Sequence, residues 1–490
     1  MQLQTRQTLR AQDVPMAVIQ CKPLPNALPA LVPKPFLPKQ TLGKVLRQIA
    51  PAPISLTAKA AAVEQAAPAE PSTGPQSSNA ERIGKDNAIL LQGFGWSSHE
   101  AGGWWKIIKE NVQAIKDAGF THIWLPPPSR SVAPQGYMPG QYYNLNSAYG
   151  GPDELRAAVA EIKKAGLAPM ADIVINHRCA DAQDESGVWN NYKNEGVPEN
   201  DLDWGTWAIT SDDPDFKGQG AKDTGADFGA APDLDHTNPK LREALKKWLN
   251  WLKDDIGFEG WRFDFAKGYG AEFVAEYCQG TVGTAVLNVG EFWTDAKWGD
   301  GGILDYDQNM PRQQLCDWLD AAGGCCVFDF VSKGIFNEAF RNNEMWRLIG
   351  PDAKQPGSSG WWPSRSVTFI GNHDTDSTQG HWPFPSGKEP PGYAYILTHP
   401  GIPCVMWEHL MDYGHKDVIS GLIDVRKRTG INARSKLEIL RAEADIYIAK
   451  VDDKLLVKIG PNNDMRDLSP SDQEWKMAMA GQDFALWEKA

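Results

Sequence analysis

The sequence predicts an α/β fold built on a parallel sheet, because short apolar runs alternate with amphipathic helical stretches from about residue 88 onward. Polar and charged residues directly follow several of the apolar runs, and in a parallel α/β architecture functional side chains gather at those ends. Two further patterns lie outside this alternation, a long segment rich in Gly, Asp and Asn after His177 and a set of short β-like runs near the C-terminus. The alternation alone leaves both an open sheet and a closed barrel possible.

The elements of the alternation are recognised one after another. AILLQGF is a short apolar run typical of a buried strand, and GGWWKIIKENVQAIKDAGF places its apolar residues on one helical face before Gly119. THIWLPPP, PDELRAAVAEIKKAG and LAPMADIVINH then give strand, helix and strand again. NPKLREALKKWLNWLKDDIGF begins with Asn238 and Pro239, an N-cap and a first-turn residue, and leads into the run GWRFDF.

Two segments interrupt or follow this core. More than fifty residues between His177 and about Leu234 have no strong helical periodicity, and an insertion of that length in a compact domain is usually functional or a small subdomain. After about residue 425, IYIAKVDDKLLVKIG predicts two short strands around a DD turn, and FALWEKA predicts a third. We therefore expect a small C-terminal antiparallel β unit.

The N-terminal segment differs from the rest in composition. Residues 1–80 contain none of the 20 Trp but 12 of the 35 Pro, with eight Lys or Arg and three Asp or Glu. Proline at this density prevents continuous helix or sheet, and PAEPSTGPQSSN resembles a flexible linker. A basic leader poor in acidic residues predicts an organelle transit peptide, and the alternative is a disordered extension that carries no address.

Composition excludes several classes of protein. The net charge of −13 argues against a general nucleic-acid binder, and no apolar run reaches the roughly 18–20 residues that span a bilayer. The seven cysteines are odd in number and lack metal-finger spacing, so we expect neither a disulfide framework nor a zinc site.

The candidate catalytic residues follow four of the apolar runs. DIVINH ends in His177, GWRFDF presents Arg262 and Asp264 on the same face of a strand, VGEFW delivers Glu291, and FIGNHDT delivers Asp374. A lone acidic residue at a strand end is more often a cap or an ion-pair partner than a catalyst. Four such groups in order, each with its own flanking pattern, favour an active site.

These motifs resemble those of glycoside hydrolase family 13, the α-amylases, and specifically their plant-type branch. The resemblance covers roughly residues 86–490 and extends to QGYMPGQYY, APDLDH, GWWP and TQGHWPFP. It implies a (β/α)8 TIM barrel with an irregular calcium-binding loop domain inserted after strand 3 and a C-terminal antiparallel β-sheet domain. The implied domains are a leader over 1–85, a catalytic barrel over 86–177 and 234–425, the insertion over 178–233, and the C-terminal domain over 426–490.

The resemblance also implies catalytic roles. Asp264 would be the nucleophile, Glu291 the general acid/base, and Asp374 the carboxylate that stabilises the oxocarbenium-like sugar. This division suits retaining cleavage, which needs one ionised carboxylate and one protonated carboxyl about 5–5.5 Å apart. We expect Arg262 to keep Asp264 ionised and an apolar setting to raise the pKa of Glu291. The implied substrate-binding residues are Tyr137, His177, Arg262, Lys267, His373, Trp361 and Trp362.

Calcium is the cofactor that the resemblance implies. Oxygen atoms of Asn, Asp and backbone carbonyls are its usual ligands. The principal site would use Asn176, Asp223, Asp233 and the carbonyl of Gly268. Asp227 and either Asp212 or Asp213 would serve a further ion, although any single loop Asp is equally well explained as a turn cap.

The pair Trp361–Trp362 resembles the surface tryptophans with which plant amylases hold starch granules. Without its GWWP context, such a pair would be read as core, since Trp is mostly buried.

The predicted function is α-amylase activity, the endo-hydrolysis of internal α-1,4 bonds of starch and malto-oligosaccharides with retention. A transglycosylase or branching enzyme on the same machinery is the alternative among enzymes, and a catalytically silent glucan-binding protein is the alternative outside them. We expect a monomer with no nucleic-acid or membrane partner. The expected location is a chloroplast or other plastid, or the cytoplasm if the leader is not a transit peptide.

Overall fold

The computed structural model describes residues 77–193 and 202–490. The first 76 residues of the predicted leader lie outside the described residues, as do residues 194–201 of the predicted insertion. Within the described ranges, no helix is both long and apolar enough to cross a membrane. All six cysteines of these ranges are free thiols.

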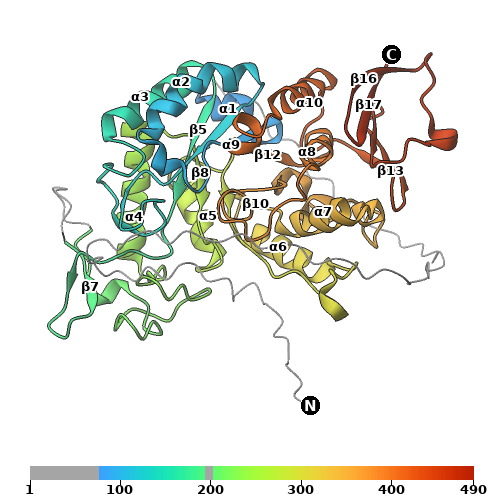
Figure 1. The fold of residues 1–490 in the computed structure, drawn as a ribbon. Coiled ribbons are helices and arrows are strands. Elements are labelled where there is room, and N and C mark those ends of the chain that lie inside the picture. The colour runs from blue at the N-terminus through green and yellow to red at the C-terminus, as the bar shows by residue number, and fades with distance from the viewer. Residues whose placement is uncertain (1–76, 194–201) are drawn as a thin grey trace, which may run out of the picture. The chain divides into compact units, whose positions relative to one another are not determined.

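Eight parallel strands close into a barrel, which confirms the predicted fold class (Figure 1). Closure occurs at the first strand, where Leu90 pairs with Cys404 on one side and with His122 on the other. The barrel strands are β1 (Leu90–Gln92), β2 (His122–Leu125), β5 (Ala168–Ile173), β8 (Gly260–Phe263), β9 (Val289–Gly290), β10 (Cys326–Phe328), β11 (Ser366–Thr368) and β12 (Ile402–Met406).

Helices alternate with these strands and cover the barrel. They are α2 (Trp104–Asp117), α3 (Pro152–Lys164), α4 (Pro239–Trp251), α5 (Ala271–Gln279), α6 (Asn309–Ala321), α7 (Phe330–Asn342), α8 (Glu389–Thr398), α9 (Trp407–Met411) and α10 (Lys416–Thr429). Single turns of 3₁₀-helix lie in the connections at η2 (Lys85–Asn87), η3 (Ser98–Ala101), η4 (Thr206–Ala208), η6 (Asp300–Gly302), η7 (Met345–Leu348), η8 (Ser358–Gly360) and η9 (Pro363–Arg365). A π-helical turn η5 (Leu252–Ile256) extends α4, and a further 3₁₀ turn, η10 (Arg466–Leu468), lies in the C-terminal unit.

Local sequence explains where these helices form. In α2, Trp105, Ile108, Val112 and Ile115 recur at helical spacing, and all of them are buried against the barrel. The start of α4 has the predicted cap, because the Asn238 side chain accepts a hydrogen bond from the Lys240 N–H.

A short helix precedes the first barrel strand. In α1 (Asn79–Ile83), the Asn79 amide donates to the carbonyls of Lys163 and Leu167 at 2.8 and 2.9 Å, and the Ala80 N–H donates to Glu259 at 2.9 Å. Residues 79–83 are therefore packed on the barrel, although they fall inside the leader predicted for 1–85.

The insertion between β5 and α4 contains little regular structure. Its described elements are the hairpin of β6 (Ala182–Gln183) with β7 (Trp189–Asn191) and the turn η4. A second hairpin, of β3 (Arg130–Ser131) with β4 (Pro139–Gln141), follows β2 and contacts the insertion through the hydrogen bond from Gln141 to Asp181. Arg178 anchors the insertion from within, because its guanidinium donates to the carbonyls of Gly140 and Leu202 and lies 4.8 Å from the ring centroids of both Tyr192 and Trp204.

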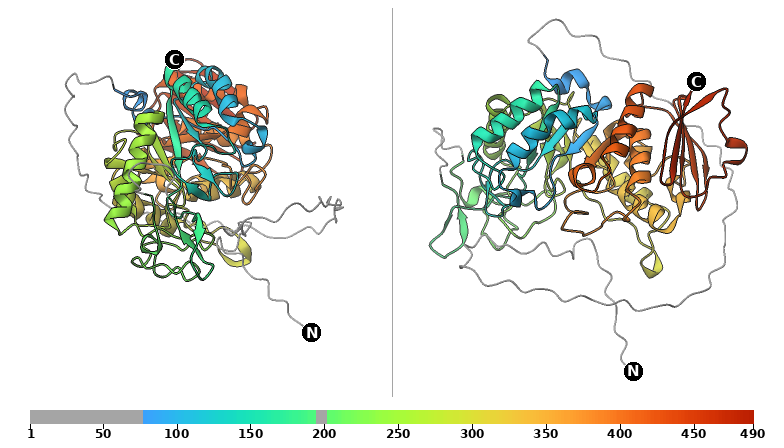
Figure 2. Two further views of the ribbon diagram at one scale, coloured as in Figure 1. Left: turned by 90° about the vertical axis from the view of Figure 1, so that its left-hand side faces the viewer. Right: turned by 45° about the horizontal axis from the view of Figure 1, so that its top comes forward.

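The C-terminal unit is a five-stranded antiparallel sheet, drawn in red in the right-hand view of Figure 2. Its order is β13 (Leu437–Ala442), β14 (Tyr447–Val451), β15 (Leu455–Ile459), β17 (Phe484–Lys489) and β16 (Trp475–Gly481). The predicted DD turn lies in the three-residue loop that joins β14 to β15, and both Asp452 and Asp453 have positive φ. Helix α10 crosses the boundary predicted at residues 425 and 426, since it continues to Thr429.

Candidate active site

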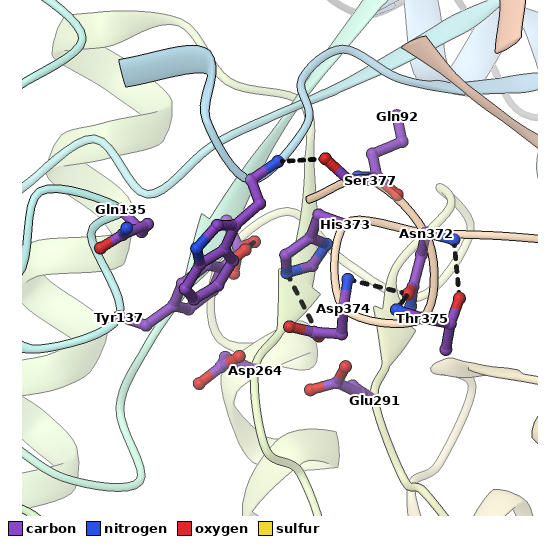
Figure 3. A network of polar contacts seen from close by, with 12 residues as sticks. Gln92, Gln135, Tyr137, Asp264, Glu291, Asn372, His373, Asp374, Thr375 and Ser377 are labelled. Atoms are coloured by element: carbon purple, nitrogen blue, oxygen red, sulfur yellow. Dashed lines mark hydrogen bonds and ion pairs between the residues drawn. The ribbon is translucent and has the colours of Figure 1, made fainter. Parts of the chain in front are cut away.

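The predicted catalytic side chains come together at the carboxyl ends of the barrel strands. Asp264 follows β8, Glu291 follows β9 and Asp374 lies in the loop after β11. Figure 3 shows the three carboxyl groups facing a common space, with His373 and Tyr137 on one side of it. Parallel strands bring their ends to one face of a barrel, so positions about 110 residues apart in sequence meet there.

Arg262 contacts three carboxyl groups of this site. Its side chain is fully buried, and its Nη1 atom lies 2.8 Å from Asp172 and 2.7 Å from Asp264. Its Nη2 atom lies 2.8 Å from Glu291 Oε1. Because one guanidinium reaches both carboxylates, the nucleophile and the acid/base predicted for the reaction are held close together.

The charges around Arg262 are not balanced. Four carboxyl groups surround one guanidinium, and the pKa values of all four are raised, in each case chiefly by burial. The negative charges of Glu291 and Asp264 raise the pKa of Asp374 further, and that of Asp264 adds to the rise for Glu291. A raised pKa suits a general acid, as we expected for Glu291.

Two opposing effects act on the pKa of Asp264. Arg262 does lower the pKa of Asp264 by charge pairing and by a hydrogen bond. Burial outweighs both effects, so the pKa of Asp264 lies above its ordinary value rather than below it. The like charges of Asp264, Glu291 and Asp374 act on one another, so these carboxyl groups titrate as a coupled cluster.

A turn with positive φ links the segment of Asp264 to Glu291. Phe265 follows Asp264 directly and has φ 41°, which a bulky side chain rarely adopts. This turn directs the Phe265 N–H at Glu291 Oε2, 3.2 Å away. Backbone strain beside Asp264 is thus coupled to the position of the acid/base.

Aromatic rings form one wall of the site. The Tyr137 and His373 rings stack with centroids 5.2 Å apart and an interplanar angle of 9°, and Trp96 stacks on Tyr137 at 6.1 Å. The Tyr137 hydroxyl donates to Asp172 at 2.9 Å, and His373 Nε2 lies 3.3 Å from Asp374. Sugar rings have apolar faces that stack on such side chains.

Two members of this site were missed at the level of sequence. Asp172 opens the motif DIVINH, yet only its contact with Arg262, 90 positions away, shows its place in the site. Trp96 lies after β1 in the run QGFGW, and only the fold brings it against Tyr137. The signal for Asp172 was its position inside a recognised motif, while no pattern distinguished Trp96 from the other tryptophans.

His177 and Lys267 lie close to this centre. His177 is buried, its Nε2 is 2.8 Å from the Tyr137 carbonyl, and its ring stacks on Phe228 at 3.8 Å. Lys267 is half-buried with its ammonium 5.4 Å from the Phe265 ring. Contact of either side chain with substrate remains a prediction.

The predicted calcium ligands also meet. Thr224 accepts a hydrogen bond from Gly270, and Ala226 donates to the Lys267 carbonyl, so the segment from Asp223 onward lies against the loop that contains Gly268. The Gly268 Cα lies against the side-chain oxygen of Asn176, where a Cβ atom would collide with it.

The acidic side chains beside this contact repel one another. Burial raises the pKa of Asp233 to about 9, and the charges of Asp223, Asp213 and Asp227 add to the rise. The oxygens Asn176 Oδ1 and Asp223 Oδ2 are buried without a hydrogen-bond partner among the described residues. In the same ranges, no cluster of three or more His, Cys, Asp or Glu side chains has metal-binding geometry. The predicted principal site has only two carboxylates, the rest being amide and backbone oxygens.

Trp361 and Trp362 are half-buried and lead into β11, whereas Asp374 follows that strand. Trp361 donates from Nε1 to Asp352 at 2.6 Å, and Arg312 lies 3.9 Å from its ring centroid. Arg365 lies 4.9 Å from the Trp362 ring. Each indole therefore has a cation against its ring, and starch binding by the pair remains a prediction.

A (β/α)8 barrel that places an Arg-linked pair of carboxyl groups and a third carboxyl at its strand ends defines the chain as a glycoside hydrolase by fold and site. Comparison with known proteins gives the family. The α-amylase catalytic domain matches residues 78–280, and the α-amylase C-terminal β-sheet domain matches residues 428–488. The chain belongs to the α-amylase family of glycoside hydrolases, family 13.

Two plant relatives illustrate this membership. “Probable alpha-amylase 2” of Arabidopsis thaliana is 43% identical over 406 residues, which cover 82% of this chain and 94% of that protein. “Alpha-amylase 3, chloroplastic” of the same plant is 43% identical over 401 residues, but the chain spans only 44% of its length. Among solved structures, an α-amylase from Malbranchea cinnamomea has the same fold, with a TM-score of 0.60 at 16% identity over 84% of this chain and 97% of that one.

Proposed function

We propose that the protein is an endo-acting α-amylase that hydrolyses internal α-1,4 bonds of starch and malto-oligosaccharides with retention of configuration. The observation that carries this proposal is the bridging of Asp264 and Glu291 by one guanidinium, with Arg262 nitrogens 2.7 and 2.8 Å from the two carboxylates. Retaining cleavage uses two carboxyl groups about 5–5.5 Å apart, whereas inversion needs a wider gap for water.

In the first step, Asp264 attacks the anomeric carbon while Glu291 gives its proton to the leaving oxygen. Burial holds that proton on Glu291, and the Phe265 N–H orients the carboxyl group. In the second step, Glu291 takes a proton from water, which attacks the same carbon and releases Asp264. Asp374, paired with His373, faces the positive charge that develops on the sugar, and Tyr137 supports the sugar ring.

Product analysis on soluble starch tests this proposal against transglycosylation on the same machinery. Hydrolysis with endo cleavage predicts early loss of iodine staining together with release of reducing ends. Staining that falls while reducing ends stay constant would indicate transfer to a sugar hydroxyl instead. Absence of any change in the glucan, with the three carboxyl groups present, would support the glucan-binding alternative.

We further propose that the protein binds Ca²⁺ through Asn176, Asp223, Asp233 and the Gly268 carbonyl, with Asp227 nearby. The unpartnered oxygens of Asn176 and Asp223 and the mutual repulsion of the carboxylates support a hard cation at this place. A bound ion would supply positive charge there and link the insertion to the loops after β5 and β8. Its removal should lower thermal stability, as detailed below.

We propose a plastid location for the protein. The basic, proline-rich leader supports it, and one relative is named as chloroplastic. Fusion of residues 1–77 to a fluorescent protein tests the address in leaf cells. Fluorescence confined to the cytosol would contradict it.

A further inference from the structure

Helix α7 contains a lysine that the catalytic scheme does not use. The Lys333 side chain is fully buried, which is rare for lysine because a buried ammonium loses its hydration. Burial lowers the pKa of Lys333 to about 7, and the nearby Asp376 partly opposes this effect. A buried cation at this cost needs a structural or functional explanation.

The contacts of Lys333 all lead to one segment. Its ammonium donates to the Trp382 carbonyl at 3.0 Å and lies 3.8 Å from Asp376 Oδ2. It also donates to Asn337 Oδ1 at 2.8 Å, and the Asn337 amide in turn donates to the carbonyls of Trp382 and Pro383 at 3.2 Å each. Two side chains one turn apart on α7 thus hold the segment between β11 and α8.

That segment carries Asp374. Its backbone is folded back on itself, since the Trp382 N–H donates to the Thr375 carbonyl at 3.0 Å and the Phe384 N–H donates to Asp376 Oδ1 at 3.0 Å. Asp376, two residues after Asp374, therefore joins the beginning of the segment, its end and Lys333.

The same segment places Trp382 opposite the loop that follows the acid/base. The Trp382 ring faces Trp293, two residues after Glu291, with centroids 6.5 Å apart and an angle of 13°. It lies so close to Gly334 that a Cβ atom there would be 2.6 Å from the indole. Glycine at 334 and lysine at 333 are thus both fitted to this one loop.

We propose that Lys333 is a positioning residue, which fixes Asp374 relative to Glu291 by binding Asp376 and the Trp382 carbonyl. The inference rests on the proposed function, in which Asp374 faces the developing charge. Small displacements of a catalytic group reduce turnover strongly, and about 1 Å can cost on the order of 100-fold. Replacing a buried ion pair by apolar or neutral groups of similar size often leaves stability unchanged or raises it. Loss of turnover without loss of stability is therefore the expected signature.

The test compares Lys333→Met, Asp376→Asn and the double variant with the wild-type protein. The matched control is Lys416→Met with Asp417→Asn, which makes the same chemical changes at the exposed start of α10. The measurements are kcat and KM for a malto-oligosaccharide, per folded molecule, and the melting temperature. We expect kcat to fall by about 10- to 100-fold in the double variant, KM to change by less than about threefold, and the control to behave as wild type.

The pattern among the variants decides the interpretation. If Lys333 acts through Asp376, the double variant loses no more turnover than the more affected single variant. Wild-type kcat per folded molecule in the double variant would overturn the inference, as would losses that simply multiply. If Lys333→Met does not fold, Asp376→Asn still tests the contact, and unchanged kcat there is equally decisive. A wild-type protein inactive on every glucan would instead contradict the proposed function.

Discussion

Replacement of Glu291 by Gln tests the division of labour among the carboxyl groups. Gln keeps the volume and can still accept the Phe265 N–H, which is 3.2 Å from Glu291 Oε2, but it has no proton to give to the leaving oxygen. General acid–base catalysis contributes about 10²- to 10⁴-fold. We therefore expect kcat to fall by that factor, equivalent to about 2.7–5.4 kcal/mol in the activation free energy.

The fold should tolerate this change. Arg262 retains Asp172 and Asp264 at 2.8 and 2.7 Å, so its charge stays paired. Removing the charge of one of the three carboxyl groups that contact this guanidinium relieves their mutual repulsion. We expect the melting temperature of Glu291→Gln to equal or exceed that of the wild type.

The assay compares two substrates that differ in their need for an acid. Cleavage of a malto-oligosaccharide expels a poor leaving group, whereas an aryl glycoside with an acidic phenol leaves without protonation. Glu291→Gln should lose far more kcat/KM, which reports the first step alone, on the former substrate. The control, Asp264→Asn, removes the nucleophile and should lose many powers of ten on both substrates. Equal losses for Glu291→Gln on both substrates would refute the assignment of the acid.

The pH profile gives a second readout. Because burial raises the pKa of Glu291, its proton is retained in the folded protein to higher pH than in an ordinary Glu. Activity should therefore fall as pH rises through that raised pKa, and Glu291→Gln should lack this alkaline limb. A limb of unchanged shape in the variant would contradict the role.

Three further predictions concern stability and binding. Chelation of calcium should lower the melting temperature, because an ion present at about 100 times its Kd adds about 2.7 kcal/mol to the free energy of unfolding. Asp223→Asn should abolish this response, and a melting temperature unchanged by chelation of the wild-type protein would argue against calcium. Asn79→Ala should reduce the free energy of unfolding by about 1–3 kcal/mol, because it removes two buried hydrogen bonds to the barrel, and a denaturant titration that shows no loss would mean that α1 contributes nothing. Replacing Trp361 and Trp362 by Ala should weaken sedimentation with starch granules by about 3- to 10-fold, with unchanged kcat on a soluble oligosaccharide; equal granule binding would assign both indoles to packing.

The helices and strands with a one-sided pattern could be predicted from sequence. The buried stripe of α2 and the Asn238 cap of α4 are local signals, and both elements lie where these signals placed them. Helix α8 gave no such signal, because every one of its ten residues is buried and the sequence therefore has no polar face. The strands β13 and β16 could not be predicted for the opposite reason, because their residues are half-buried or exposed and form no apolar run.

The active site likewise contains residues that could be predicted from sequence and contacts that could not. Asp264, Glu291 and Asp374 stand in recognisable motifs, so their positions at strand ends could be anticipated. The ion pair of Arg262 with Asp172 joins positions 90 residues apart in sequence, and the hydrogen bond from Lys333 to the Trp382 carbonyl joins positions 49 residues apart. Contacts of this kind depend on how barrel strands and helices are placed side by side, and no local spacing encodes them. The direction of the Asp264 pKa shift could not be predicted from sequence, because burial, which dominates the shift, is a property of the fold.

The excess of carboxyl groups around Arg262 makes the catalytic centre a receptor for cations. Asp172, Asp264 and Glu291 contact one guanidinium, and Asp374 is repelled by all three carboxyl groups, so an added positive charge would relieve this repulsion. Sugar mimics with a protonated ring nitrogen carry that charge where the natural substrate acquires it only during reaction. Such compounds should inhibit the protein more strongly than neutral sugars of the same shape, and their affinity should rise with pH until the nitrogen itself loses its proton.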